Sequence, residues 1–538
     1  MDKRTILAIV LACAVVMVYQ MFFVRPVPRQ PVPPELSDKN ESIVATPVEK
    51  APQAPTPALD AKVALSPKPS VPAQDITVET PLYSAVFTTQ GAALKAFKLK
   101  NYRQTLKADS PLINLVDVKE GMNLPLVLTF PGSNVMVSPD DMFQADSAAV
   151  SLAQDNDAKK LTFSISYPQG VQVEKIFTFY ADRYRLDLDV RVFNATMLNL
   201  KEKGQLTWHQ YVDPKAEEDG YGHTGPVYQI KTDVETLTVG KMESSKIIGP
   251  EVSWGAFESK YFIAALISKQ PALTNLVLAK DPKNLVYVSL DGPSILVPTG
   301  QSSEFSYSLY LGPKDHDILK AEGVGLENAI DFGSWIKWLA LPLLITLNFI
   351  YKFVHNYGVA IIILTIIIKI FFWPLGTKSY KSMKDMQKIQ PLMNELKTKY
   401  KDDKQRMNQE VMQLYKTHKV NPLGGCLPML LQIPVFFGLY KALLYAIELR
   451  HQPFVWWIQD LSAKDPYYIT PIVMGATMVL QQKMTPAAGD PMQQKLMMIM
   501  PIVFTFLFLN FPSGLVIYWL FNNILSIGQQ YYINKSLN

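Results

Sequence analysis

The 538-residue sequence is poor in cysteine and in charged residues, and each shortage excludes a broad class of protein. Its two cysteines, Cys13 and Cys426, are too few to staple a secreted scaffold together with disulfides. Charged residues make up only 18% of the chain, below the roughly 25% of an average soluble protein, so we expect part of the chain to lie outside water. The 52 basic and 47 acidic residues nearly balance, which excludes a nucleic-acid binder that is basic throughout.

The N-terminal segment has an apolar run followed by a proline-rich stretch. Residues 5–24 carry no charge, follow Lys3 and Arg4, and are long enough to cross a bilayer, so we predict a signal-anchor helix within 1–24. The apolar run continues eleven residues past Cys13, which favours an anchor over a lipoprotein signal. Twelve of the 39 prolines fall in residues 25–72, and such a composition cannot bury a core. We therefore predict an extended tether over 25–77.

Residues 78–330 are predicted to form a large all-β sandwich. Polar and apolar residues alternate strictly over 185–192, 161–167 and 304–310, as expected for half-buried antiparallel strands. Such runs recur between clusters of turn residues, and there is no sustained helical pattern before 312. The region contains none of the common catalytic or nucleotide-binding motifs, and aromatic residues such as Trp208 and Trp254 more often fill a core than line a cleft.

The second half of the chain is predicted to be embedded in a membrane. Residues 331–357 are apolar but contain lysines, a proline and two tryptophans, so we place them as an amphipathic helix in the outer interface. Residues 358–375 form the second transmembrane helix, 376–422 a basic cytoplasmic loop, and 423–538 four further spans with a short tail. With the anchor, this predicts six crossings and both termini inside. The spans are 5–24, 358–375, 423–447, 467–483, 496–511 and 513–533.

The basic loop is predicted to form a cytoplasmic helical hairpin. Residues 378–419 contain 11 Lys or Arg against 5 Asp or Glu, and the positive-inside rule therefore places them in the cytoplasm. An apolar stripe, a break near 400–403 and a returning stripe describe two helical arms. A solvated face over a small core is the default interpretation, whereas a methionine-rich basic surface also suits binding of a partner. The candidate contacts are Met383, Met386, Lys388, Lys397 and Lys399.

Lys369 is the one charge in the middle of a predicted span. A central charge costs about 2.5–3.5 kcal/mol on insertion scales, so it requires a compensating environment. Two interpretations stay open at this point. The ammonium could snorkel past Pro374 to the headgroups, or it could lie in a polar cavity with Thr365, one turn away, and with polar residues of other spans such as Gln432 and Asn522.

Several short motifs in the second half resemble one known family. Residues 335–535 are similar to the YidC/Oxa/Alb family of membrane protein insertases, in its Gram-negative form with a large periplasmic domain. The motifs that carry the resemblance are NPLGGCLP at 421–428 with QIP at 432–434, DPYY at 465–468, DPMQQK at 490–495 and FPSGLVIYW at 511–519.

The resemblance implies a protein of the bacterial inner membrane that is not an enzyme. It implies a five-helix core that accepts nascent transmembrane segments from a hydrophilic groove and releases them into lipid, without cofactor, metal or specific nucleic-acid recognition. The expected partners are nascent inner-membrane proteins, the Sec translocon (SecYEG and SecDF), the ribosome and the signal-recognition-particle pathway, and membrane lipids. The β domain is expected in the periplasm and both termini in the cytoplasm.

The resemblance also assigns groove positions to this sequence. Lys369 takes the place of the family's usual Arg, which keeps the charge but replaces five fixed donors by three rotatable ones. Thr365 and Trp519 match positions of the groove core, and Trp519 replaces a more usual Tyr. Together with Gln432 and Asn522, these are the predicted groove residues.

Two other classes of function fit parts of the sequence. An ion or solute transporter would use the same intramembrane lysine, but internal repeats and paired broken helices, which are typical of transporters, are not detected. A membrane-tethered carbohydrate-binding protein or enzyme would act through the β domain, and deleting that domain would then abolish its function.

Overall fold

The computed structural model describes residues 72–536 apart from 133–136, 154–156, 215–221, 243–244, 334, 402, 419, 421–426 and 485–490. All of these described residues belong to one compact unit, Asp60–Asn538. The predicted anchor and nearly all of the predicted tether lie outside the described residues. The first strand begins at Asp75, three residues before the predicted start of the β domain at 78.

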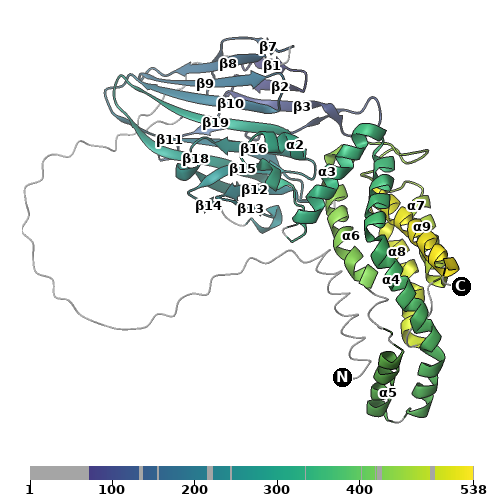
Figure 1. Cartoon of the computed structure of the whole chain (residues 1–538). Coiled ribbons are helices and arrows are strands. Elements are labelled where there is room, and N and C mark those ends of the chain that lie inside the picture. Colours follow the sequence, from purple (N-terminus) through teal and green to yellow (C-terminus); the bar gives the residue numbers. More distant parts are fainter. Residues whose placement is uncertain are drawn as a thin grey trace, which may run out of the picture. The chain divides into compact units, whose positions relative to one another are not determined.

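The N-terminal part of the described chain is built from three sheets (Figure 1). The central, nine-stranded sheet has the order β13 (Asp233–Thr236), β12 (Gly225–Ile230), β15 (Val252–Glu258), β16 (Phe262–Ser268), β19 (Ser302–Pro313), β10 (Arg185–Asn194), β9 (Val171–Tyr180), β8 (Ala158–Ser166) and β6 (Gln144–Ala145). One five-stranded sheet has the order β4 (Leu112–Asn114), β3 (Ala93–Arg103), β2 (Tyr83–Thr88), β1 (Asp75–Glu79) and β7 (Ala149–Ser151). The other has the order β14 (Lys246–Ile248), β17 (Asn275–Lys280), β18 (Leu285–Val297), β11 (Leu200–Tyr211) and β5 (Val127–Thr129).

The alternating sequence pattern explains how these sheets pack. On β10, Leu186, Leu188, Val190 and Val192 are fully buried while the residues between them reach solvent, because successive side chains of a strand point to opposite faces. The three segments predicted as strands lie in β8, β10 and β19, so the predicted β-sandwich is confirmed. Phe87 of β2 packs against aromatic rings of β8 and β9, which joins the first sheet to the central one.

The tryptophans that a carbohydrate-binding alternative would need are part of this core. Trp208 and Trp254 are fully buried, and the indole of Trp254 donates a hydrogen bond to Gln229. Side chains in that position stabilise the sandwich and cannot line an open cleft. The 3-10 turns η1 (Val239–Lys241) and η2 (Pro271–Leu273) connect strands, whereas η3 (Leu326–Ala329) and η4 (Ile447–Leu449) lie between helices of the described chain.

The C-terminal part of the described chain is helical. Its helices are α2 (His316–Ala321), α3 (Lys337–Val354), α4 (Tyr357–Lys399), α5 (Lys404–Thr417), α6 (Leu427–Tyr445), α7 (Ile469–Met484), α8 (Pro491–Phe508) and α9 (Ser513–Ser536). α9 packs along α4 and α7, and α3 packs against α6 and α4. Among the described residues, α3 and α4 each have an apolar window of 18 residues that is long enough to cross a bilayer.

The long helix α4 contains both a predicted span and the first arm of the predicted hairpin. The sequence predicts the span over 358–375 and the hairpin over 376–422, and α4 continues from one into the other through Pro374 and Pro391 for 43 residues (Figure 1). A proline removes one backbone hydrogen bond but does not always end a helix, and here packing against α9 and α5 supports both sides of Pro374. The predicted break near 400–403 is present: α4 ends at Lys399, and the Asp403 carboxylate caps α5.

Candidate functional site

Lys369 lies on α4 and faces α9. Its ammonium donates a hydrogen bond to the hydroxyl of Ser526 at 2.6 Å, and that hydroxyl in turn donates to the carbonyl of Asn522 at 2.7 Å. Ser526 is only 3% exposed. Because a hydroxyl is neutral, the lysine is hydrogen-bonded but its charge is not cancelled, and no carboxylate of the described chain forms an ion pair with it. Such a cation can attract a carboxylate from outside the protein.

Polar side chains continue on both sides of this contact. Tyr380, three helical turns after Lys369 on α4, is within hydrogen-bonding reach of Ser526 and of Gln481 on α7. On α9, Asn523 donates to Thr477 of α7 at 3.3 Å. A hydrogen-bonded set of polar residues therefore connects α4, α7 and α9, which is how helices in an apolar solvent satisfy buried polar groups.

A glycine allows the two longest helices to approach each other at this set. Gln529 of α9 donates to the carbonyl of Trp373 on α4 at 3.1 Å. A Cβ added at Gly376 would lie 2.8 Å from the amide nitrogen of Gln529, so any larger residue at 376 would displace that amide. Small residues at close helix crossings are typical of membrane helix packing.

The other predicted groove residues differ in whether they contact the polar residues around Lys369. Thr365 is 1% exposed and donates to the carbonyl of Ile361 at 2.7 Å, so its hydroxyl is bonded within its own helix. Gln432 of α6 is within hydrogen-bonding reach of the Tyr518 hydroxyl. Asn522 is half-buried and meets the Lys369 network through its backbone carbonyl. The structure thus brings Lys369 and Asn522 together through Ser526.

Trp519 belongs to an aromatic cluster. Its ring lies 4.7 Å from that of Phe436, 5.1 Å from Phe508 and 5.9 Å from Phe504. Its indole nitrogen is buried and has no hydrogen-bond partner among the described residues. The cluster joins α6, α8 and α9, one turn of α9 away from Asn522.

The structure adds residues to the groove positions that the resemblance assigns. Ser526, the direct partner of Lys369, and Gln481 are among the polar span residues that the sequence offers for a groove, whereas Tyr380 and Gln529 are not. Polarity inside a predicted span marks Ser526, Gln481 and Gln529 as unusual. Tyr380 is marked only by its spacing of eleven residues from Lys369, which returns to the same helix face.

The hairpin of α4 and α5 has a small apolar core. Met386 is 8% exposed and Met393 is 4% exposed, and the Tyr415 hydroxyl of α5 donates to the Met393 sulfur at 3.3 Å. Met393 therefore joins the two helices, while Met386 is buried and Met383 is half-buried. Lys388 is exposed and pairs with Asp385 at 3.0 Å, and the Lys399 ammonium lies 5.4 Å from the Tyr400 ring centre. The predicted contact Lys397 is half-buried.

Comparison with known proteins covers the whole described chain. Residues 349–538 match the family model described as 60Kd inner membrane protein, and residues 75–346 match the YidC periplasmic domain. The chain is 60% identical to the membrane protein insertase YidC of Syntrophus aciditrophicus, over 99% of this chain and 100% of the relative. It is 44% identical to the insertase of Geobacter metallireducens, over 100% and 99%.

A solved structure of an active YidC insertase with its first transmembrane domain resolved covers 87% of this chain. The alignment spans 95% of that structure, with 20% identity and a TM-score of 0.38.

Proposed function

Because this chain belongs to the YidC family of membrane protein insertases, we propose that Lys369 and the polar residues around it form the groove through which substrates enter the membrane. Family membership makes the chain an inner-membrane protein that inserts membrane proteins and is not an enzyme. Family membership therefore argues against the two alternatives, a transporter and a carbohydrate-binding protein or enzyme. The observation that carries the groove proposal is the Lys369–Ser526 contact, in which a half-buried cation has no counter-ion in the described chain.

The groove lowers the cost of moving a polar flank across the bilayer. A carboxylate at the centre of a bilayer costs about 2.5–3.5 kcal/mol on insertion scales, and more when it is bare of water. The Lys369 ammonium offers it a charge-assisted hydrogen bond, and the hydroxyls of Ser526 and Tyr380 offer neutral ones. Groove water would supply the rest of the lost hydration.

The lipid supplies the driving force for insertion. Each Leu, Ile, Phe or Val at a helix centre gains about 0.3–0.6 kcal/mol, so 20 such residues gain about 6–12 kcal/mol. That gain exceeds the cost of carrying one or two acidic residues across. The substrate helix would move over outward-facing apolar side chains of α6 and α8, such as Ile433 and Phe506. No nucleotide is required for such a partitioning step.

The hairpin and the loops suggest where partners bind and how the protein is oriented. We propose that Lys388, Lys397, Lys399 and the half-buried Met383 form the surface that meets the ribosome in the cytoplasm. Met386 supports that surface from inside the hairpin. Delivery from the signal-recognition-particle pathway and action beside the Sec translocon (SecYEG and SecDF) belong to the same proposal. Both termini would then be cytoplasmic and the β domain periplasmic.

The test uses the purified chain in liposomes with a single-span substrate that carries an acidic flank. Protease protection reports insertion by wild type, Lys369→Ala and Lys369→Arg, with Lys352→Ala, an exposed lysine of α3, as the matched control. A hydrogen bond to a charged group contributes about 1.5–3 kcal/mol, so we expect Lys369→Ala to slow insertion about ten- to a hundredfold. Lys369→Arg and Lys352→Ala should stay near wild type. Undiminished insertion by Lys369→Ala would reject the groove cation while leaving the family assignment intact.

A further inference from the structure

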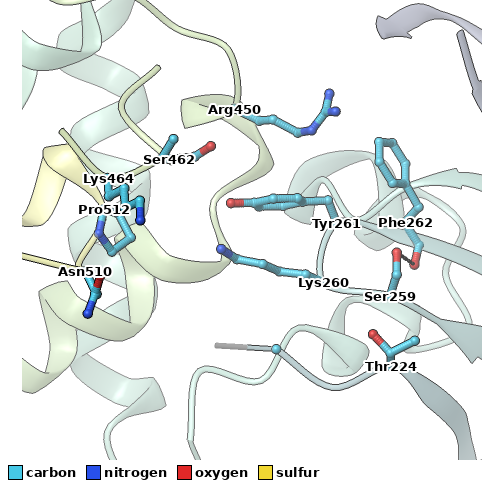
Figure 2. A pocket seen from close by; sticks show the side chains of 12 residues that line it. Thr224, Ser259, Lys260, Tyr261, Phe262, Arg450, Ser462, Lys464, Asn510 and Pro512 are labelled. Carbon is cyan, nitrogen blue, oxygen red and sulfur yellow. Dashed lines mark hydrogen bonds between the residues drawn. The ribbon is translucent and has the colours of Figure 1, made fainter. Parts of the chain in front are cut away.

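A cavity of about 480 Å³ lies between the β region and the loops that join the membrane helices (Figure 2). From the β region, Lys260 and Tyr261 extend toward those loops from the turn between β15 and β16. From the other side come Arg450, Lys464 and Asn510. Three of the twelve lining residues are cations and none is acidic, so the lining of the cavity is net positive.

The cationic groups differ in how firmly they are held. Arg450 donates to the carbonyl of Arg103 at 2.6 Å and lies 5.6 Å from the Phe262 ring centre, which fixes its guanidinium. Lys260 and Lys464 form no ion pair within the described chain. Each ammonium lies beside a tyrosine ring, Lys260 at 4.7 Å from Tyr261 and Lys464 at 5.9 Å from Tyr468. Both lysines therefore keep donors available for a ligand.

A hydroxyl without a hydrogen-bond partner also favours an anionic ligand in this cavity. The Tyr261 hydroxyl is buried and has no hydrogen-bond partner among the described residues. A buried hydroxyl without a partner costs about 1–3 kcal/mol, so this position favours a bound acceptor. An acceptor that also carries negative charge satisfies the hydroxyl and the lysines together.

The cavity lies at the ends of membrane helices, which selects a lipid as the source of that acceptor. Asn510 and Pro512 lie between the end of α8 and the start of α9, and Lys464 lies five residues before α7. Trp456, 80% exposed, lies in the same connecting region, and such rings are enriched at the headgroup level of membranes. Ile472, on the first turn of α7, is 57% exposed and offers an apolar surface for acyl chains.

We propose that this cavity binds the phosphate of an anionic phospholipid headgroup, held by Lys260, Lys464, Arg450 and the Tyr261 hydroxyl. A lipid bound there would bridge the β region and the loops of the membrane core. The inference rests on the proposed placement of these loops at the membrane surface, and it does not require insertion activity.

The test measures lipid binding to the full chain without any substrate. Phosphatidylglycerol is titrated into the purified protein in detergent, and native mass spectrometry counts the lipids retained. Each lysine near an anionic lipid is worth about a factor of five, so Lys260→Gln with Lys464→Gln should weaken the tightest site about thirtyfold. The charge-keeping pair Lys260→Arg with Lys464→Arg should bind like wild type. The control pair Lys98→Gln with Lys283→Gln removes two exposed lysines elsewhere on the β region and should also bind like wild type.

Three results would overturn the proposal. The first is equal phosphatidylglycerol binding by wild type and the Lys260→Gln, Lys464→Gln variant. The second is inorganic phosphate binding as tightly as the lipid, which would make this a site for a free anion. The third is displacement of the lipid by an acidic substrate peptide at lower concentration than by a second lipid, which would make it a peptide site.

Discussion

The β region, built from strands β1 to β19, and the helical region, built from α3 to α9, expose different kinds of side chain to their surroundings. The β region buries phenylalanines and aliphatic residues and exposes lysines, with the buried ion pair Lys314–Glu258 as an exception. The helical region exposes isoleucines such as Ile370 and buries Ser526 and Gln529. The difference shows that burial alone does not define a core. Which side chains are exposed depends on the solvent, which is water for the β region and lipid for the helical region.

Removing whole regions should separate their roles with the largest effect. A chain without 78–312 should still insert a small single-span substrate into liposomes, because the helices around Lys369 remain. A chain without residues 469–536 loses α9, which supplies the partner of Lys369, together with α7 and α8, and should not insert it at all. Protease protection measures both. Loss of insertion in the first chain alone would assign the activity to the β region.

Two equally exposed isoleucines should respond oppositely to a charge. Ile370 on α4 is 66% exposed and Ile247 on β14 is 72% exposed. Ile370→Lys puts an ammonium into lipid and should destabilise the protein by about 3 kcal/mol. Ile247→Lys puts it into water and should stay within about 0.5 kcal/mol of wild type. Thermal unfolding in lipid nanodiscs compares the two, and equal destabilisation would contradict the assignment of the two solvents.

A buried carboxyl group should make the stability of the β region depend on pH. Glu202 is fully buried, neither of its carboxyl oxygens has a partner in the described chain, and burial raises the pKa of Glu202 to about 7. The folded chain therefore keeps a proton that the unfolded chain, with a pKa of about 4.3, releases as the pH rises. The contribution of Glu202 is fully present below pH 4.3 and is lost as the pH rises through 7, by about 3 kcal/mol.

The variant Glu202→Gln isolates this contribution because the amide does not titrate. Relative to wild type, it should gain about 3 kcal/mol in the free energy of unfolding between pH 4 and pH 8. Circular dichroism of the strand signal during unfolding of the full chain measures it. His209, whose pKa burial lowers to about 4, titrates in both proteins and cancels in the difference. A constant difference between variant and wild type across this range would show that Glu202 is ionised when folded.

A smaller effect is expected from the partner of Lys369. Ser526→Ala removes the hydrogen bond from Lys369 and the one to the Asn522 carbonyl, and for a net loss of about 1 kcal/mol it should slow insertion about fivefold. It should have no further effect in a Lys369→Ala background, since the two residues then act as one unit. Thr346→Ala on α3, whose hydroxyl bonds within its own helix, is the matched control. Additive losses in the double variant would separate Ser526 from the cation.

Much of this organisation was predictable because each solvent leaves its own period in the sequence. The alternation over 185–192 predicts β10, and the charged break near 400–403 predicts the turn between α4 and α5. The continuity of α4 through Pro374 was not predictable, because it depends on packing by distant helices. Lys369 could be identified because a charge in lipid is energetically unfavourable. Ser526, 157 residues away, was one of several polar residues in the predicted spans, and only the structure shows that it contacts Lys369.

The burial of charged residues in the β region could not be predicted from the sequence either. The Lys175 ammonium is fully buried and donates to the carbonyls of Gly91, Ala92 and Leu126. Alternation alone indicates only which face of β9 it occupies. The carbonyls that accept its hydrogen bonds belong to loops of two other sheets. The sequence pattern of one strand does not predict which distant loops will lie beside it.

The central claim is that the helices enclose a wet polar interior behind a lipid-facing surface, and cysteine labelling tests it most directly. In a chain with Cys13→Ser and Cys426→Ser, single cysteines replace Asn522 and Ile524, which lie two residues apart on different faces of α9. A membrane-impermeant maleimide is added from the cytoplasmic side, and it reacts only with a thiolate in contact with water. We expect Asn522→Cys to be labelled, and Ile524→Cys, although 43% exposed, to stay unlabelled. Labelling of Ile524→Cys alone would contradict the account.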